Sequence, residues 1–142
     1  MKLLKVYFDH LAMFEEGTFD IDLFASDRVS ASDESTFNLA RHLHINNIVA
    51  LAGINASGKT TALNLLELAC RITDGSPARG SGLPSTLPTA INGSSMFKCV
   101  VWHDGSAYLI KSMLEAVLDE DDNPALHFSE EAVYSLPPKA LT

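Results

Sequence analysis

The feature that most constrains the fold of this chain is the nonapeptide GINASGKTT, residues 53–61, which lies between an apolar run and a helical pattern. The apolar run is IVALA, residues 48–52, and such a continuous run is typical of a strand buried on both faces of a parallel sheet. In residues 60–72, apolar side chains recur at the spacing of one helix face: Leu65, Leu68, Ala69 and Ile72. The nonapeptide is therefore predicted to connect a central strand to a helix.

The composition of this connection predicts that it binds an anion. The first N–H groups of a helix have no partners within it, and the peptide dipoles place about half a positive charge at that end. Gly53 and Gly58 permit positive φ, so that successive N–H groups can surround a phosphate. Lys59 adds a mobile charge for the outer phosphates, and the Thr60 hydroxyl is placed to ligate Mg²⁺. The spacing G-x-x-x-x-G-K-[ST] is matched in full, which happens by chance about once in two hundred chains of this length.

Length and composition limit the remaining choices. The 142 residues, 46% of them hydrophobic, can bury the core of one ordinary domain. No apolar run approaches the ~20 residues that cross a bilayer, and the start MKLLK lacks the apolar region and cleavage site of a signal peptide. We therefore expect a cytoplasmic chain with no membrane partner. The net charge of −8 argues against a nucleic-acid surface formed by these residues alone, because such surfaces are usually basic.

The residues before the apolar run predict a β-hairpin and a linker. Apolar and polar residues alternate in residues 4–8 and again in residues 19–23, as in half-buried strands. The connection DHLAMFEEG makes an antiparallel hairpin of the two. Residues 28–47 are polar and read as a linker with at most one helical turn.

The second half predicts a flexible segment followed by antiparallel strands. Residues 73–95 hold four of the eight glycines and three of the six prolines, so we expect a mobile loop whose core residues are at most Leu83, Leu87 and Ile91. The stretch MFKCVVWHDGSAYLIKSML then predicts two strands around an Asp-Gly turn at residues 104–105. Residues 115–138 extend this meander, with a turn at residues 122–124.

With these elements in order, the chain resembles the N-terminal part of the ABC-type ATPases of the SMC and RecF kind. Within them it is similar to the AAA-domain ATP-binding proteins that include the overcoming-lysogenization-defect nucleases. The resemblance rests on LLKVYFDHLAMFEEGTFDIDL, on NNIVALAGINASGKTTALNLL with its Walker A loop and, more weakly, on HDGSAYLIKSML and HFSEEAVYSLPP. It implies an α/β fold with an incomplete P-loop NTPase core, N-terminal antiparallel strands and a C-terminal β-rich arm. The implied division is residues 1–75, the first part of an ATPase head, and residues 76–142, a flexible loop and the arm.

The resemblance also implies the ligand and its contacts. We expect ATP with Mg²⁺, held by Gly53, Asn55, Ala56, Ser57, Gly58, Lys59, Thr60 and Thr61, with Thr60 as the metal ligand. The family completes its site with a glutamine loop, a signature motif, a Walker B strand and a switch histidine, and these 142 residues contain none of them. The acidic run LDEDD, residues 118–122, is interpreted as a solvated turn. The chain is therefore expected to be an N-terminal fragment, or one segment of a split gene, of an ATPase whose two heads form a homodimer.

Two alternatives remain open. A P-loop kinase or GTPase would use the same loop for phosphoryl transfer, although the GTPase motif Asn-Lys-x-Asp is absent. The other is a nucleotide-binding module without turnover, or a decayed fragment. Because hydrolysis needs a group that positions the attacking water, and none is visible, we expect these residues to bind ATP without hydrolysing it at a useful rate. A DNA or nuclease partner is compatible with the resemblance, but no residue specifies one.

Overall fold

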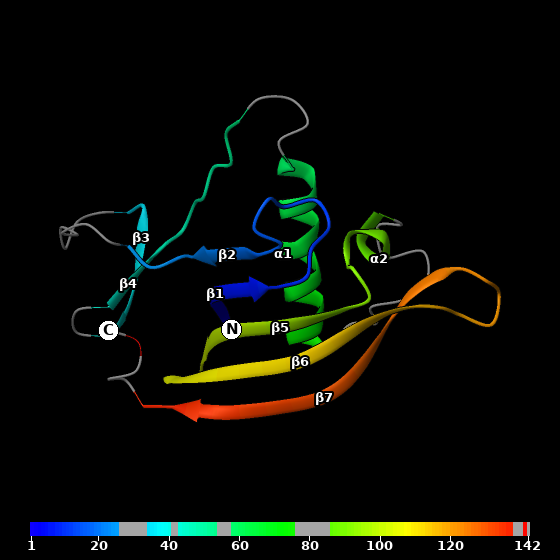
Figure 1. Ribbon diagram of the computed structural model, residues 1–142. Coiled ribbons are helices and arrows are strands. Elements are labelled where there is room, and N and C mark those ends of the chain that lie inside the picture. The colour runs from blue at the N-terminus through cyan, green and yellow to red at the C-terminus, as the bar shows by residue number, and fades with distance from the viewer. Residues whose placement is uncertain (26–33, 41–42, 54–57, 76–85, 138–140, 142) are drawn as a thin grey trace.

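The computed structural model describes residues 1–25, 34–40, 43–53, 58–75, 86–137 and 141. The fold is α/β, with antiparallel strands and two helices in the described ranges (Figure 1). In chain order the elements are β1 (Lys2–Phe8), β2 (Phe19–Asp22), β3 (Thr36–Ala40), β4 (Leu43–Asn46), α1 (Lys59–Asp74), α2 (Thr86–Ala90), β5 (Ser94–His103), β6 (Ser106–Leu118) and β7 (Pro124–Leu136).

The main sheet has five strands in the order β2-β1-β5-β6-β7, and every neighbouring pair is antiparallel. The predicted N-terminal hairpin is confirmed, because Val6 on β1 lies opposite Ile21 on β2. On its other side β1 pairs with β5, where Val6 lies opposite Cys99. One sheet thus unites strands from both halves of the chain.

Of the two turns predicted in the C-terminal meander, the one at residues 104–105 is confirmed, whereas the one predicted at residues 122–124 lies at residues 119–123, because Pro124 begins β7. Asp104 and Gly105 connect β5 to β6 with φ angles of 52° and 78°, the left-handed conformation that a two-residue hairpin requires. Between β6 and β7, the Asp119 carboxylate accepts hydrogen bonds from the backbone N–H groups of Asn123, at 2.8 Å, and Asp121, at 3.0 Å. These bonds, the one from Asn123 above all, lower the pKa of the Asp119 carboxyl. The acidic run therefore serves as a turn, as expected.

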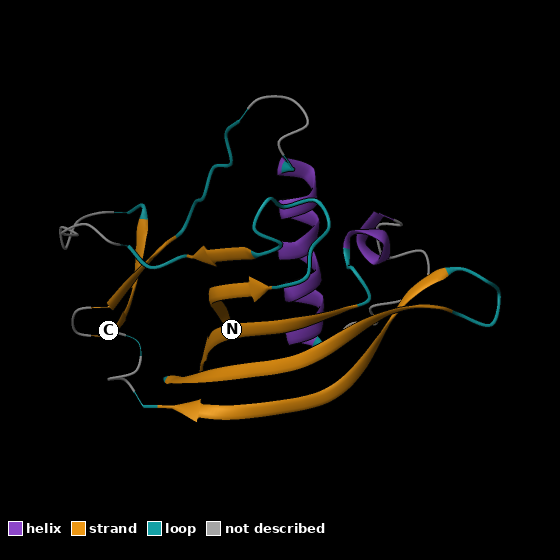
Figure 2. Ribbon diagram, in the orientation of Figure 1, coloured by secondary structure: helices purple, strands orange, loops and turns teal. Residues whose placement is uncertain are grey.

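Helix α1 covers one face of the main sheet (Figure 2). The predicted helix is confirmed, and it ends at Gly75, whose φ is 76° and whose N–H donates to the Arg71 carbonyl. Its buried side chains pack against β1 and β5 in a core that includes the rings of Phe8 and Phe97, with centroids 4.9 Å apart. At its buried positions α1 carries Ala62, Leu65, Leu68 and Ala69.

The prediction of a buried parallel strand at residues 48–52 is wrong. These residues form no regular structure, and Ile48 exposes 80% of its surface, Val49 46%. A strand buried on both faces needs a hydrogen-bonded neighbour on each side. The described strands pair with one another in antiparallel fashion, and no parallel pair occurs among them. The apolar run is an extended, exposed approach to α1.

Two further expectations are corrected. The predicted linker, residues 28–47, contains a two-stranded sheet of β3 and β4, and an isolated bridge between Phe24 and Ile45 joins β4 to the segment that follows β2. Within residues 73–95, the predicted burial of Leu87 and Ile91 is confirmed, but the segment also contains the short helix α2, which was not predicted and which buries Ala90. Leu83 and the rest of residues 76–85 lie outside the described residues, so the predicted mobility there stays a prediction.

Candidate functional site

The N-terminus of α1 is prepared for an anion by its backbone. Gly58 occupies the position before the first helical residue with φ 80° and ψ 8°, a left-handed conformation that favours glycine. A Cβ atom at Gly58 would meet the Phe14 ring at 4.0 Å, so the requirement for glycine is conformational rather than steric. No side chain caps the helix among the described residues, and its first turn carries no acid. The positive end of the helix dipole therefore meets no negative charge from its own first turn.

Lys59, the first residue of α1, connects the two ends of the loop. Its Nζ donates a hydrogen bond of 2.8 Å to the carbonyl oxygen of Gly53. This bond places the Lys59 ammonium group beside Gly53, the first residue of the nonapeptide. A negatively charged oxygen can compete with this carbonyl, because a hydrogen bond to an ionised acceptor is about twice as strong as one to a neutral acceptor.

A hollow of about 360 Å³ lies beside this contact. Part of its wall is apolar and part comes from the loop itself: its lining residues are Phe14, Leu51, Ala52, Gly53, Gly58, Lys59 and Ala62. A volume of this size is at the lower end for small-molecule sites, and an apolar wall with one charged group is their usual composition. The hollow can therefore accept a ligand that combines an anionic and an apolar part.

Phe14 is a lining residue that the sequence analysis missed. It belongs to the connection between β1 and β2, more than forty positions before Gly58, and its ring packs on that of Phe19 with centroids 5.9 Å apart. The signal in the sequence was an aromatic residue directly before two acids, in a connection where turn and polar residues are expected. Only the packing of this connection against the start of α1 gives Phe14 its place.

The predicted ligand contacts are brought together in part. Gly53, Gly58 and Lys59 line the hollow, and Thr60 is exposed in the first turn of α1. The Thr61 hydroxyl donates to Sδ of Met13 at 3.6 Å, so it must rotate to reach a phosphate. Asn55, Ala56 and Ser57 lie outside the described residues. Within the described ranges, no three His, Cys, Asp or Glu side chains gather as a metal site, and Thr60 as a Mg²⁺ ligand stays a prediction.

Comparison of the chain with protein-family models, curated proteins and solved structures gives no significant match. The resemblance to SMC- and RecF-type ATPases therefore rests on the quoted residues. Among the described residues, no helix is both long enough and apolar enough to cross a membrane.

Proposed function

We propose that the chain binds ATP with Mg²⁺ through residues 53–61. The observation that carries the proposal is the contact between Lys59 Nζ and the Gly53 carbonyl, beside a hollow at the uncapped start of α1. In this proposal the N–H groups around Gly58 hold the β-phosphate. Lys59 leaves the carbonyl to bridge the β- and γ-phosphates, and the Thr60 hydroxyl ligates Mg²⁺.

The apolar side of the hollow supports a nucleotide over inorganic phosphate. Phe14 and Leu51 offer surface on which a nucleoside can exclude water, whereas free phosphate gains nothing from it. The finer fold assignment, an incomplete P-loop NTPase core from a dimeric ATPase of the SMC and RecF kind, is part of the same proposal. It rests on the motif and on the helix that follows it. DNA or a nuclease as a partner of the longer protein stays a prediction.

Titration calorimetry with Mg-ATP tests the loop. Lys59→Ala removes a charge-assisted hydrogen bond, and we expect binding to weaken about 10- to 100-fold. Arg71→Ala is the matched control, because it removes one positive charge from the same helix three turns away, where Arg71 pairs with Glu67 at 2.7 Å. Equal affinity of wild type and Lys59→Ala, with both folded, would show that the loop is not the site.

The metal assignment has its own test. Thr60→Ala removes the proposed Mg²⁺ ligand, whereas Thr60→Ser keeps the hydroxyl and fits the same motif. We expect Mg²⁺ to strengthen ATP binding by wild type and Thr60→Ser but to lose most of that effect in Thr60→Ala. A Mg²⁺ effect of the same size in all three proteins would remove Thr60 from the proposal.

A further inference from the structure

The two edges of the main sheet differ in length and in cover. β2 forms one edge with four residues, and β7 forms the other with thirteen. Directly after β2, the Leu23 N–H donates to the Leu4 carbonyl of β1, and the Leu23 carbonyl accepts a hydrogen bond from the Asn46 N–H of β4. The small sheet therefore meets that edge where β2 ends. Among the described residues, no strand pairs with the outer side of β7, so its edge is the long free one (Figure 1).

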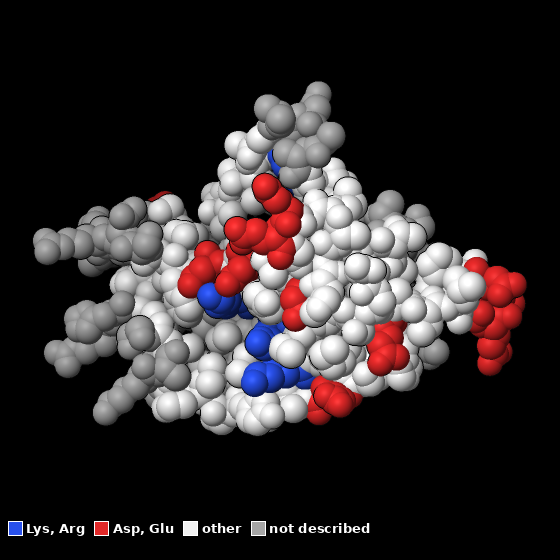
Figure 3. All heavy atoms as spheres, in the orientation of Figure 1, with Lys and Arg blue, Asp and Glu red and all other residues white. Residues whose placement is uncertain are grey.

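The last five residues of β7 form the most accessible part of this free edge. A β-bulge at Glu130 and Glu131 precedes them, and Glu130 has a φ of 54°. Beyond the bulge, Val133 exposes 66% of its surface and Tyr134 50%, although adjacent side chains of a strand point to opposite faces. Residues 132–136 carry no charge, and in Figure 3 the lower edge of the molecule is white where β7 ends in Figure 1. An apolar edge of this kind can pair with a further strand, because its outward N–H and C=O groups have no partner strand.

The exposure of Val133 is a consequence of how the sheet is covered. Val133 lies opposite Ile110 on β6, and directly opposed residues share a face. Ile110 packs against the core, so Val133 points to the side that α1 covers. The helix packs over β1 and β5, however, and β7 lies two strands beyond β5. Val133 is therefore an apolar side chain that a strand added beyond β7 would bury.

We propose that residues 132–136 of β7 pair in antiparallel fashion with the same residues of a second copy of this chain. Two identical antiparallel strands are related by a two-fold axis perpendicular to the sheet. An axis at Val133 places this residue opposite its own copy and Ala132 opposite Tyr134 of the second copy. Both pairs are apolar, and Glu131 then lies opposite the uncharged Ser135. An axis nearer the bulge would bring the glutamates of the two copies together, where like charges repel.

The same geometry limits the assembly to two copies. Pairing at β7 uses the one long free edge of each sheet in the described residues, and the opposite edge is short and met by β4. The interface is isologous and closes on itself, so no row of sheets can grow from it. It lies on the last strand rather than at the loop of residues 53–61, and it needs no ATP.

Analytical ultracentrifugation without nucleotide tests the proposal. Because the interface is small, we expect wild type to dimerise with a dissociation constant of about 1–100 µM. Val133→Lys and Val133→Glu should each weaken dimerisation about tenfold or more, since each places two like charges opposite each other at the axis. An equimolar mixture of the two variants should dimerise again, because a positive charge then lies opposite a negative one.

Leu118→Lys is the matched control, because Leu118 on β6 is an apolar residue with nearly the same exposure, 65%, outside residues 132–136. It should dimerise like wild type. Circular dichroism establishes that each variant is folded, which we expect because Val133 contributes little to the core. A wild type that stays monomeric over the whole concentration range would overturn the proposal. So would dimers that persist in both Val133 variants, a mixture that stays monomeric, or growth beyond two copies.

Discussion

The two faces of the main sheet contain neighbouring residues in opposite environments. Phe97 on β5 is fully buried against α1, whereas the next residue, Lys98, points to the other side over the Tyr7 ring. On β1, Phe8 is buried, whereas Tyr7 lies beside Lys98 on the open face, the side of the main sheet that points away from α1. The comparison teaches that the period of two in a strand separates two tasks. One face holds the fold together by apolar burial, and the other carries charged side chains beside aromatic rings.

The largest expected effect comes from the helix-covered face. Phe97→Ala leaves a cavity among Phe8, Leu65 and Leu68, and large-to-small changes at such sites cost about 3–5 kcal/mol in the free energy of unfolding. Tyr134→Ala, at a side chain that is half exposed on the open face, should change that free energy by about 0.5 kcal/mol or less. Urea unfolding of both variants measures the contrast. Similar losses in the two would mean that the open face also contributes to the core.

Thiol reactivity tests how well the face of the sheet covered by α1 is protected from solvent. Burial raises the pKa of the Cys99 thiol to about 12; it also raises the pKa of the Cys70 thiol, but Cys70 is exposed on α1. At pH 8 the fraction of Cys99 present as thiolate is about a thousandfold below that of a thiol with an ordinary pKa of 9.0. Iodoacetamide labelling followed by peptide mass analysis should therefore modify Cys70 first. Rapid labelling of Cys99 in the native protein would show that the covered face opens readily.

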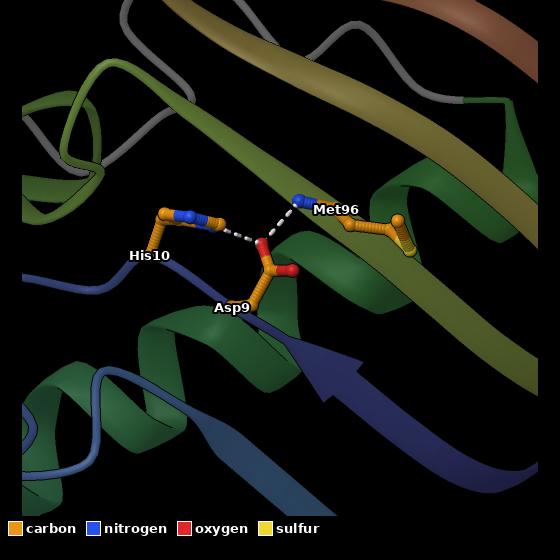
Figure 4. Close-up of polar contacts among 3 residues, drawn as sticks. All are labelled: Asp9, His10 and Met96. Carbon is orange, nitrogen blue, oxygen red and sulfur yellow. Dashed lines mark hydrogen bonds and ion pairs between the residues drawn. The ribbon is translucent and has the colours of Figure 1, made fainter.

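Asp9 lies where β1 leaves the sheet and connects it to β5 (Figure 4). Its carboxylate accepts a 2.6 Å hydrogen bond from the Met96 N–H, and Nδ1 of His10 lies 2.9 Å from the same oxygen. Asp9→Ala leaves a part-buried N–H unpaired, which we expect to cost about 1–3 kcal/mol in unfolding free energy. Asp9→Asn keeps an oxygen acceptor and should lose less. Amide hydrogen exchange at Met96 should accelerate in the alanine variant; unchanged exchange would place the stabilisation of this strand elsewhere.

The smallest effect is expected on the open face. Lys98→Thr removes one member of the opposed lysine pair and introduces a residue that favours strands. The free energy of unfolding should stay the same or rise by a few tenths of a kcal/mol, and the gain should fall as salt is added. A clear loss of stability would mean that the contact between Lys98 and the Tyr7 ring outweighs the repulsion from Lys111.

The local part of the candidate site could be predicted, and its surroundings could not. The position of Gly58 and Lys59 at the start of α1 could be predicted, because the motif, its spacing and the apolar periodicity that follows all lie within about twenty consecutive residues. Phe14 was missed because its contact with the loop joins distant parts of the chain. The strand predicted at residues 48–52 failed for a related reason, since an apolar run fits a buried strand only where neighbouring strands flank it. None does so among the described residues.

By itself, the sequence determined the elements with short-range signals. These are the β1–β2 pair, α1 up to Gly75, the Asp104-Gly105 turn and the Asp119 turn. Their causes are local: alternation, helical periodicity, left-handed φ angles and side-chain hydrogen bonds to nearby backbone. Only the tertiary structure decided that β1 lies between β2 and β5, that α1 covers one face, and that Lys98 faces Lys111 on the other. Alternation divides a strand into two faces, but which face is buried is set by the free energy of packing against a helix that lies elsewhere in the chain.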